Sequence, residues 1–136
     1  MNRTVGWAPV AFGIAMGMVM GLWSFDGPMP SPAWIGEYGD TSRRLLRLGH
    51  IAFIMLGVIS IMVETELDRS ALAPRSRRIA ARLMMAGNVL LPITLCAAAA
   101  WRPLKYLMPP PAMCVFVALA LVAWGARRPL AGRTRP

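Results

Sequence analysis

The sequence predicts an all-α integral membrane protein, a four-helix bundle of antiparallel up-down hairpins with both termini on the cytoplasmic side. The first observation behind this prediction is composition, because 57% of the 136 residues are hydrophobic, more than an ordinary soluble domain of this size carries. The second is that the apolar residues gather in four runs with basic residues at their ends. We expect one transmembrane domain over residues 1–128 and a basic, disordered tail over residues 129–136.

The four predicted spans cover residues of about 5–23, 43–64, 78–101 and 110–126. A helix rises about 1.5 Å per residue, so roughly 20 apolar residues cross a hydrocarbon core of about 30 Å. The first run is long and no small-x-small site follows it, so we expect a retained span and not a cleaved signal. The last run is short, and Pro110 and Pro111 extend it because proline is tolerated in the first turn of a helix.

The connections carry their own signals. Prolines stiffen the segment from Ser24 to Ser42. Side-chain oxygens of Asp40, Thr41 and Ser42 are expected to accept hydrogen bonds from the free amides of a helix that begins near Thr41. The charged segment from Glu64 to Arg78 is expected to be a solvated turn.

Charge placement predicts the threading. With the termini inside, ten basic residues fall on the inner side and five on the outer side, which follows the positive-inside rule and suits a bacterial inner membrane. The residues expected at the lipid headgroups are Trp7, Trp23, Trp101, Trp124, Arg43 and Arg47. The formal charge of +9 has no recognition motif beside it, so we expect membrane lipid and not nucleic acid as the partner.

His50 is the only histidine, and it enters an apolar run. An ionisable ring in a membrane helix marks a functional site by default. One interpretation makes His50 the axial ligand of a haem or chlorophyll-type macrocycle, or a proton-relay group. Gly57 on the same helix face would then let a flat ring or another helix approach. The other is that His50 hydrogen-bonds a neighbouring helix or extends toward the outer interface.

A soft metal site is a further alternative. In an up-down bundle, His50 falls at about the depth of Met20, Cys96 and Cys114, and imidazole, thiol and thioether are ligands that suit copper(I). If the outer compartment is oxidising, a disulfide between the two cysteines is an option comparable to the metal site. Met and Cys in membrane helices are more often ordinary packing residues.

Two patterns predict close helix packing. Gly13, Gly17 and Gly21 recur every four residues and form a small-residue groove, which serves either another subunit, a second copy or a helix of the same chain. Asn88 and Pro92 lie near the middle of the third span, where the proline leaves a backbone carbonyl free. We expect Ser60 or Thr94 to satisfy this pair. The alternative is that the free carbonyl and the Asn88 side-chain amide bind a proton, an ion or water.

The sequence contains no phosphate-binding loop, nucleophile elbow or zinc-protease motif. We therefore expect a non-catalytic accessory or scaffold subunit of a larger membrane complex, which binds other membrane subunits or itself through helix packing. The alternatives are an electron-transfer or pigment protein that holds a tetrapyrrole through His50, and a small metal-handling or carrier protein. No motif is specific enough to indicate a family.

Overall fold

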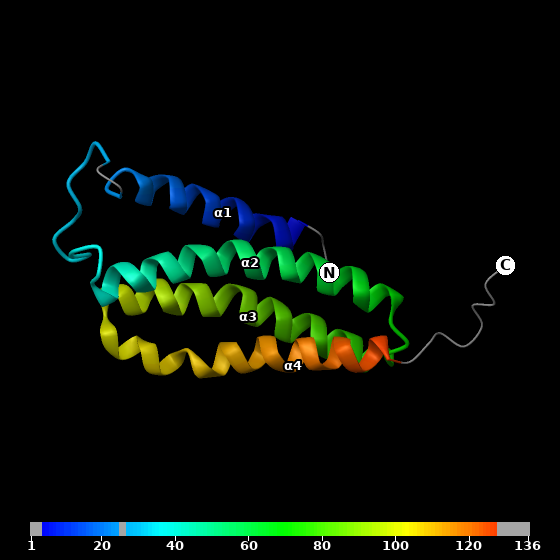
Figure 1. The fold of residues 1–136 in the computed structure, drawn as a ribbon. Coiled ribbons are helices and arrows are strands. Elements are labelled where there is room, and N and C mark those ends of the chain that lie inside the picture. Colours follow the sequence, from blue (N-terminus) through cyan, green and yellow to red (C-terminus); the bar gives the residue numbers. More distant parts are fainter. Residues whose placement is uncertain (1–3, 25–26, 128–136) are drawn as a thin grey trace.

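The computed structural model describes residues 4–24 and 27–127, so the predicted tail at 129–136 lies outside the described residues. Within these residues the chain forms four long helices: α1 (Thr4–Gly21), α2 (Thr41–Arg69), α3 (Pro74–Ala100) and α4 (Pro109–Ala126). A short 3-10 helix, η1 (Arg102–Leu107), precedes α4. Figure 1 shows the long helices side by side in chain order. The all-helical prediction is confirmed.

Three of these helical segments are long and apolar enough to cross a membrane. They are Thr41–Arg69, Pro74–Ala100 and the combined segment Arg102–Ala126, while α1 is apolar over the shorter stretch Gly6–Gly21. A helix of that length buried in a soluble core would be covered by protein, but at most 39% of each apolar window is buried here. The chain is therefore a helical protein with the features of a membrane protein.

The helix boundaries differ from the sequence prediction at one connection. α2 continues to Arg69 because Leu67, only 5% exposed, extends its buried face by a further turn. The connection to α3 comprises only residues 70–73, so a turn does lie within the predicted segment from Glu64 to Arg78, but the predicted bounds are wrong. α3 then begins at Pro74, where the missing amide hydrogen removes no helical hydrogen bond.

The helices differ in how they are held. The main core joins α2, α3 and α4 through six buried residues: Leu56, Val63, Leu67, Ala80, Met84 and Ala118. α1 instead packs along α2. Neighbouring helices approach closely at glycines, with Gly57 against Val10, Gly49 against Cys96 and Gly87 against Val115. The absence of a side chain at these positions allows the close packing on which helix association in lipid depends.

The connection between α1 and α2 is tied to the bundle at what we call the long-loop end, formed by the end of α1, the start of α2 and the end of α3. Ile35, 1% exposed, packs there with Met20, Leu46 and Ala99. Gly36 has a φ of 73°, which glycine adopts without steric cost.

The Asp40 carboxylate accepts a hydrogen bond from the Glu37 amide at 2.8 Å. It makes none to the amides of α2, so the predicted side-chain cap is wrong, although the predicted helix start near Thr41 is confirmed. The loop's own turn takes the carboxylate that would otherwise cap the helix.

Candidate functional site

His50 lies at the α1–α2 interface. A Cβ atom added to Gly17 would be 3.4 Å from His50 Cδ2 and 3.7 Å from Nε2, so the imidazole lies over this glycine. The ring is half-buried, and its Nδ1 atom is buried without a hydrogen-bond partner among the described residues. His50 therefore faces α1, and the groove glycine makes room for its ring.

The space expected beside Gly57 is filled. A Cβ atom at Gly57 would lie 2.6 Å from Val10 Cγ2 and 2.9 Å from the Gly6 carbonyl oxygen, both on α1. Of the two uses expected for Gly57, room for a flat macrocycle is therefore wrong, whereas the close approach of another helix is confirmed.

The predicted glycine groove on α1 is divided between two environments. A Cβ atom at Gly13 would lie 2.9 Å from Phe53 Cβ and 3.0 Å from the His50 carbonyl oxygen, so this glycine contacts α2. Gly17 contacts His50, as described above. Gly21 has nothing within 4 Å of an added Cβ and is exposed, so the groove ends before it.

Two sulfur atoms meet at the long-loop end. The Cys96 thiol on α3 lies 4.0 Å from the Met16 thioether sulfur on α1. Met20, 6% exposed, belongs to the same cluster of side chains, against which Met16 and Cys96 pack. Met16 was not among the residues predicted for a metal site, although it lies four positions, and so about one helical turn, before Met20.

Cys114 does not join this cluster. Its neighbour Val115 packs against Gly87, which precedes Cys96 by nine positions and thus by about 14 Å along a helix. The prediction that Cys114 shares the depth of Cys96 is wrong, because α4 starts deeper along α3 than an ideal up-down hairpin implies. Both cysteines are free, and this separation exceeds what a disulfide can bridge.

Within residues 4–24 and 27–127, no group of three or more carboxylate, histidine or cysteine side chains is placed to hold a metal ion. Of the predicted metal ligands His50, Cys96, Cys114 and Met20, the structure places Cys96 and Met20 in one cluster with Met16.

Asn88 is buried without the predicted partners. It is 1% exposed, and neither its Nδ2 nor its Oδ1 atom has a hydrogen-bond partner among the described residues. The Ser60 hydroxyl is likewise buried and unpaired. The Thr94 hydroxyl donates to the Leu90 carbonyl at 2.6 Å. Pro92 is buried beside them in α3.

The residues predicted for the headgroup layer fall into two groups. Trp7, Trp101 and Trp124 are 58%, 63% and 56% exposed. Trp23 is half-buried, and Arg43, 7% exposed, donates a hydrogen bond to its carbonyl oxygen. Arg47 lies over the Tyr38 ring, with 4.2 Å from Cζ to the ring centroid.

Arg43 and Arg47 therefore hold the connection between α1 and α2. Arg43 turns into the protein and not toward lipid headgroups, because the loop supplies the acceptors that its guanidinium group needs.

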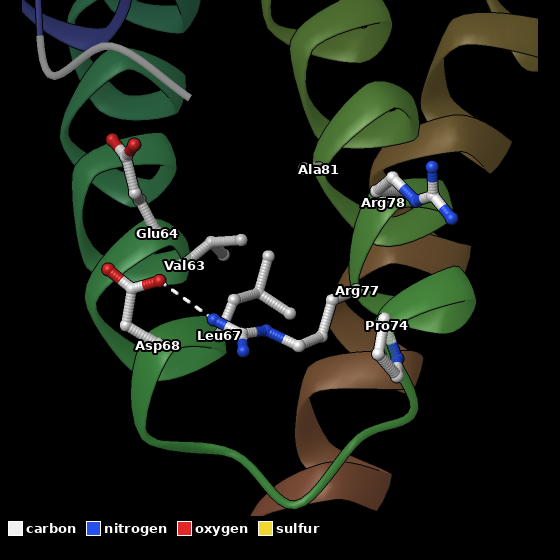
Figure 2. A pocket seen from close by; sticks show the side chains of 8 residues that line it. All are labelled: Val63, Glu64, Leu67, Asp68, Pro74, Arg77, Arg78 and Ala81. Atoms are coloured by element: carbon white, nitrogen blue, oxygen red, sulfur yellow. Dashed lines mark hydrogen bonds and ion pairs between the residues drawn. The ribbon is translucent and has the colours of Figure 1, made fainter.

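The opposite end of the bundle, which we call the arginine end, consists of the end of α2, the start of α3 and the end of α4. A cleft of about 280 Å³ opens between α2 and α3 there, and Val63, Leu67 and Ala81 supply its apolar lining. In Figure 2, an ion pair of 2.8 Å between Asp68 and Arg77 joins the two helices across it. The Arg78 side chain points away from α2.

A second stripe on α1 was not predicted. The residues that face α2 are Gly6, Val10, Gly13, Gly17 and Met20. The opposite face carries an exposed stripe at spacings of three and four, made of Ala8, Ala11, Ala15 and Met18, and Leu22 extends it just beyond the helix end. The spacing was visible in the sequence, but only the position of α2 reveals which stripe remains uncovered.

In comparisons with protein families, curated proteins and solved structures, nothing matches this chain.

Proposed function

We propose that this protein is a non-catalytic accessory subunit of a larger membrane complex, and that it binds a transmembrane helix of another subunit along α1. The observation that carries the proposal is the exposed stripe of Ala8, Ala11, Ala15, Met18 and Leu22. α1 already uses its other face to pack on α2, so a partner on the exposed stripe would hold this helix from both sides.

The chemistry of the stripe suits a helix. Ala11 and Ala15 are four positions apart, the small-xxx-small spacing that lets helix backbones approach closely in lipid. Met18, 73% exposed, adds a flexible apolar side chain that adapts to a partner surface.

We further propose an antiparallel up-down topology with both termini in the cytoplasm of a bacterial inner membrane. The reversed order of contacts supports it, since Gly6 lies against Ile61 whereas Gly17 lies against His50. The excess of basic residues at the arginine end supports the direction. α1 has 18 residues and a length of about 27 Å, which supports a fourth crossing with slight local thinning.

Site-specific photo-cross-linking in native membranes tests the accessory role. A photoreactive phenylalanine analogue at Met18 should form an adduct with a different polypeptide, because that side chain would meet the partner helix. The same analogue at Phe116 on α4, which is 65% exposed, is the matched control and should form lipid adducts only. If the analogue at Met18 formed no protein adduct, or only an adduct between two copies of this chain, the accessory role would be excluded.

A second candidate function is soft-metal binding at the long-loop end. The favouring observation is the separation of 4.0 Å between Cys96 Sγ and Met16 Sδ. With metal–sulfur bonds of roughly 2.3 Å, as in zinc thiolates, both sulfurs fit around one ion. Met20 lies in the same cluster, and thiol and thioether ligands select copper(I).

Copper(I) titration of the purified protein tests this candidate. Cys96→Ser should abolish stoichiometric binding, and Cys114→Ser should leave it unchanged because Cys114 lies outside the cluster. Equal binding by the two variants would remove the assignment to this site.

A further inference from the structure

Three arginines form a row on the exposed side of α3 at the arginine end. Arg75, Arg78 and Arg82 are all exposed and follow one another at spacings of three and four, so they share one helix face. Together with Ile79 they line a surface groove of about 360 Å³. The row is therefore a concave, positively charged surface with an apolar residue in its middle.

The charges of this row are not used inside the protein. Within the described part of the chain, none of the three guanidinium groups makes a hydrogen bond or an ion pair. Nearby acids have other partners: Asp68 pairs with Arg77 at 2.8 Å, and Glu66 lies 3.8 Å from Arg69. In Figure 2, Arg78 points away from the α2 side of α3, whereas Arg77 points toward it.

The same face of α3 becomes apolar beyond the arginines. Met85, Val89 and Ile93 continue the row at spacings of three and four, and they are 40%, 38% and 48% exposed. Three cationic side chains thus lead directly into an uncovered apolar track on a helix long enough to cross a membrane.

From this arrangement we propose that the Arg75–Arg78–Arg82 row binds one anionic phospholipid. Guanidinium groups bind phosphate oxygens through paired, charge-assisted hydrogen bonds, and the acyl chains would lie along Met85, Val89 and Ile93. The arginine row matches the anionic headgroup of a phospholipid, and the apolar track matches its acyl chains. A soluble anion has no acyl chains, and a neutral lipid has no anionic headgroup. The proposal does not depend on the partner of α1.

Native mass spectrometry of the full chain, released from nanodiscs of phosphatidylcholine with a minor share of phosphatidylglycerol, tests the site. One phosphatidylglycerol should remain bound to the wild-type protein. In the double variant Arg78→Gln/Arg82→Gln, retention should fall by at least about tenfold, as expected for two basic residues facing an anionic headgroup. Both arginines are exposed and make no hydrogen bond or ion pair within the described residues, so the double variant should fold normally. A thermal unfolding curve checks its stability.

The matched control is Arg44→Gln/Arg102→Gln, which removes two exposed arginines at the other end of the bundle. It should leave retention unchanged. An equal loss in this control would show general attraction to charge and overturn the site. Displacement of the lipid by excess inorganic phosphate would show a free-phosphate site and also overturn the proposal, because phosphate lacks the acyl chains that use the apolar track.

Discussion

The Arg43 guanidinium on α2 donates a hydrogen bond of 2.6 Å to the Trp23 carbonyl oxygen, just beyond the end of α1. Carbonyls at the end of a helix lack intrahelical partners, and here a charged side chain from the next helix supplies one. A second contact of 3.4 Å reaches Ser24 Oγ. Because Arg43 is only 7% exposed, it acts as an internal connector between α1 and α2.

Replacing Arg43 by glutamine should lower the free energy of unfolding by about 2 kcal/mol, because a partly buried hydrogen bond from a charged donor is lost. Arg44→Gln is the matched control and should change it by less than about 0.5 kcal/mol, since that side chain is exposed. Denaturant unfolding in detergent, followed by circular dichroism, measures both. Equal losses in the two variants would contradict the connecting role of Arg43.

The α1–α2 contact predicts opposite effects at two groove glycines. Gly13→Ala should destabilise the protein by about 1–3 kcal/mol, the usual cost of overpacking, because the new Cβ would lie 3.0 Å from the His50 carbonyl oxygen. Gly21→Ala meets nothing within 4 Å, so it should be neutral or stabilising by up to about 1 kcal/mol through helix propensity. Thermal unfolding of both variants decides; a stable Gly13→Ala protein would disprove the close approach.

The unpaired Asn88 predicts a stabilising substitution. Asn88→Leu keeps the branching and the number of side-chain heavy atoms, and it removes two buried polar atoms that have no partner among the described residues. Stability should therefore be unchanged or higher by up to about 2 kcal/mol. Ser60→Ala, which removes the other unpaired group, should behave likewise. The free energy of unfolding is the measurement. A loss above about 1 kcal/mol in Asn88→Leu would mean that a polar ligand or water satisfies the amide in the folded protein.

Much of the fold follows from local patterns. The apolar runs predicted the four helices, and Pro110 and Pro111 predicted the start of the last one, because these signals act within one or two turns of the chain. The end of α2 was missed for the same reason. Its last turn is charged in sequence, and the buried contact of Leu67 that extends it comes from other helices.

The candidate sites were less predictable, because they depend on which helix faces which. Matching residues by depth placed Cys96 and Cys114 together. In the structure, α4 packs at a different height along α3, and α1 brings Met16 to Cys96 instead. Arg43 and Arg47 were predicted to lie at the lipid headgroups, because they stand beside the outer end of an apolar run. The loop's carbonyl groups and the Tyr38 ring, brought back by chain folding, draw them inward.

The sequence by itself determined that this is a helical protein of membrane type, since apolar length and flanking charge are properties of each segment alone. Only the tertiary structure decided how each helix face is used. It covered Gly57 with α1 and left the alanine stripe of α1 and the arginine row of α3 open. The physical reason is that several faces of each helix are apolar enough to pack, and close backbone approach selects among them only when the neighbouring helix is present.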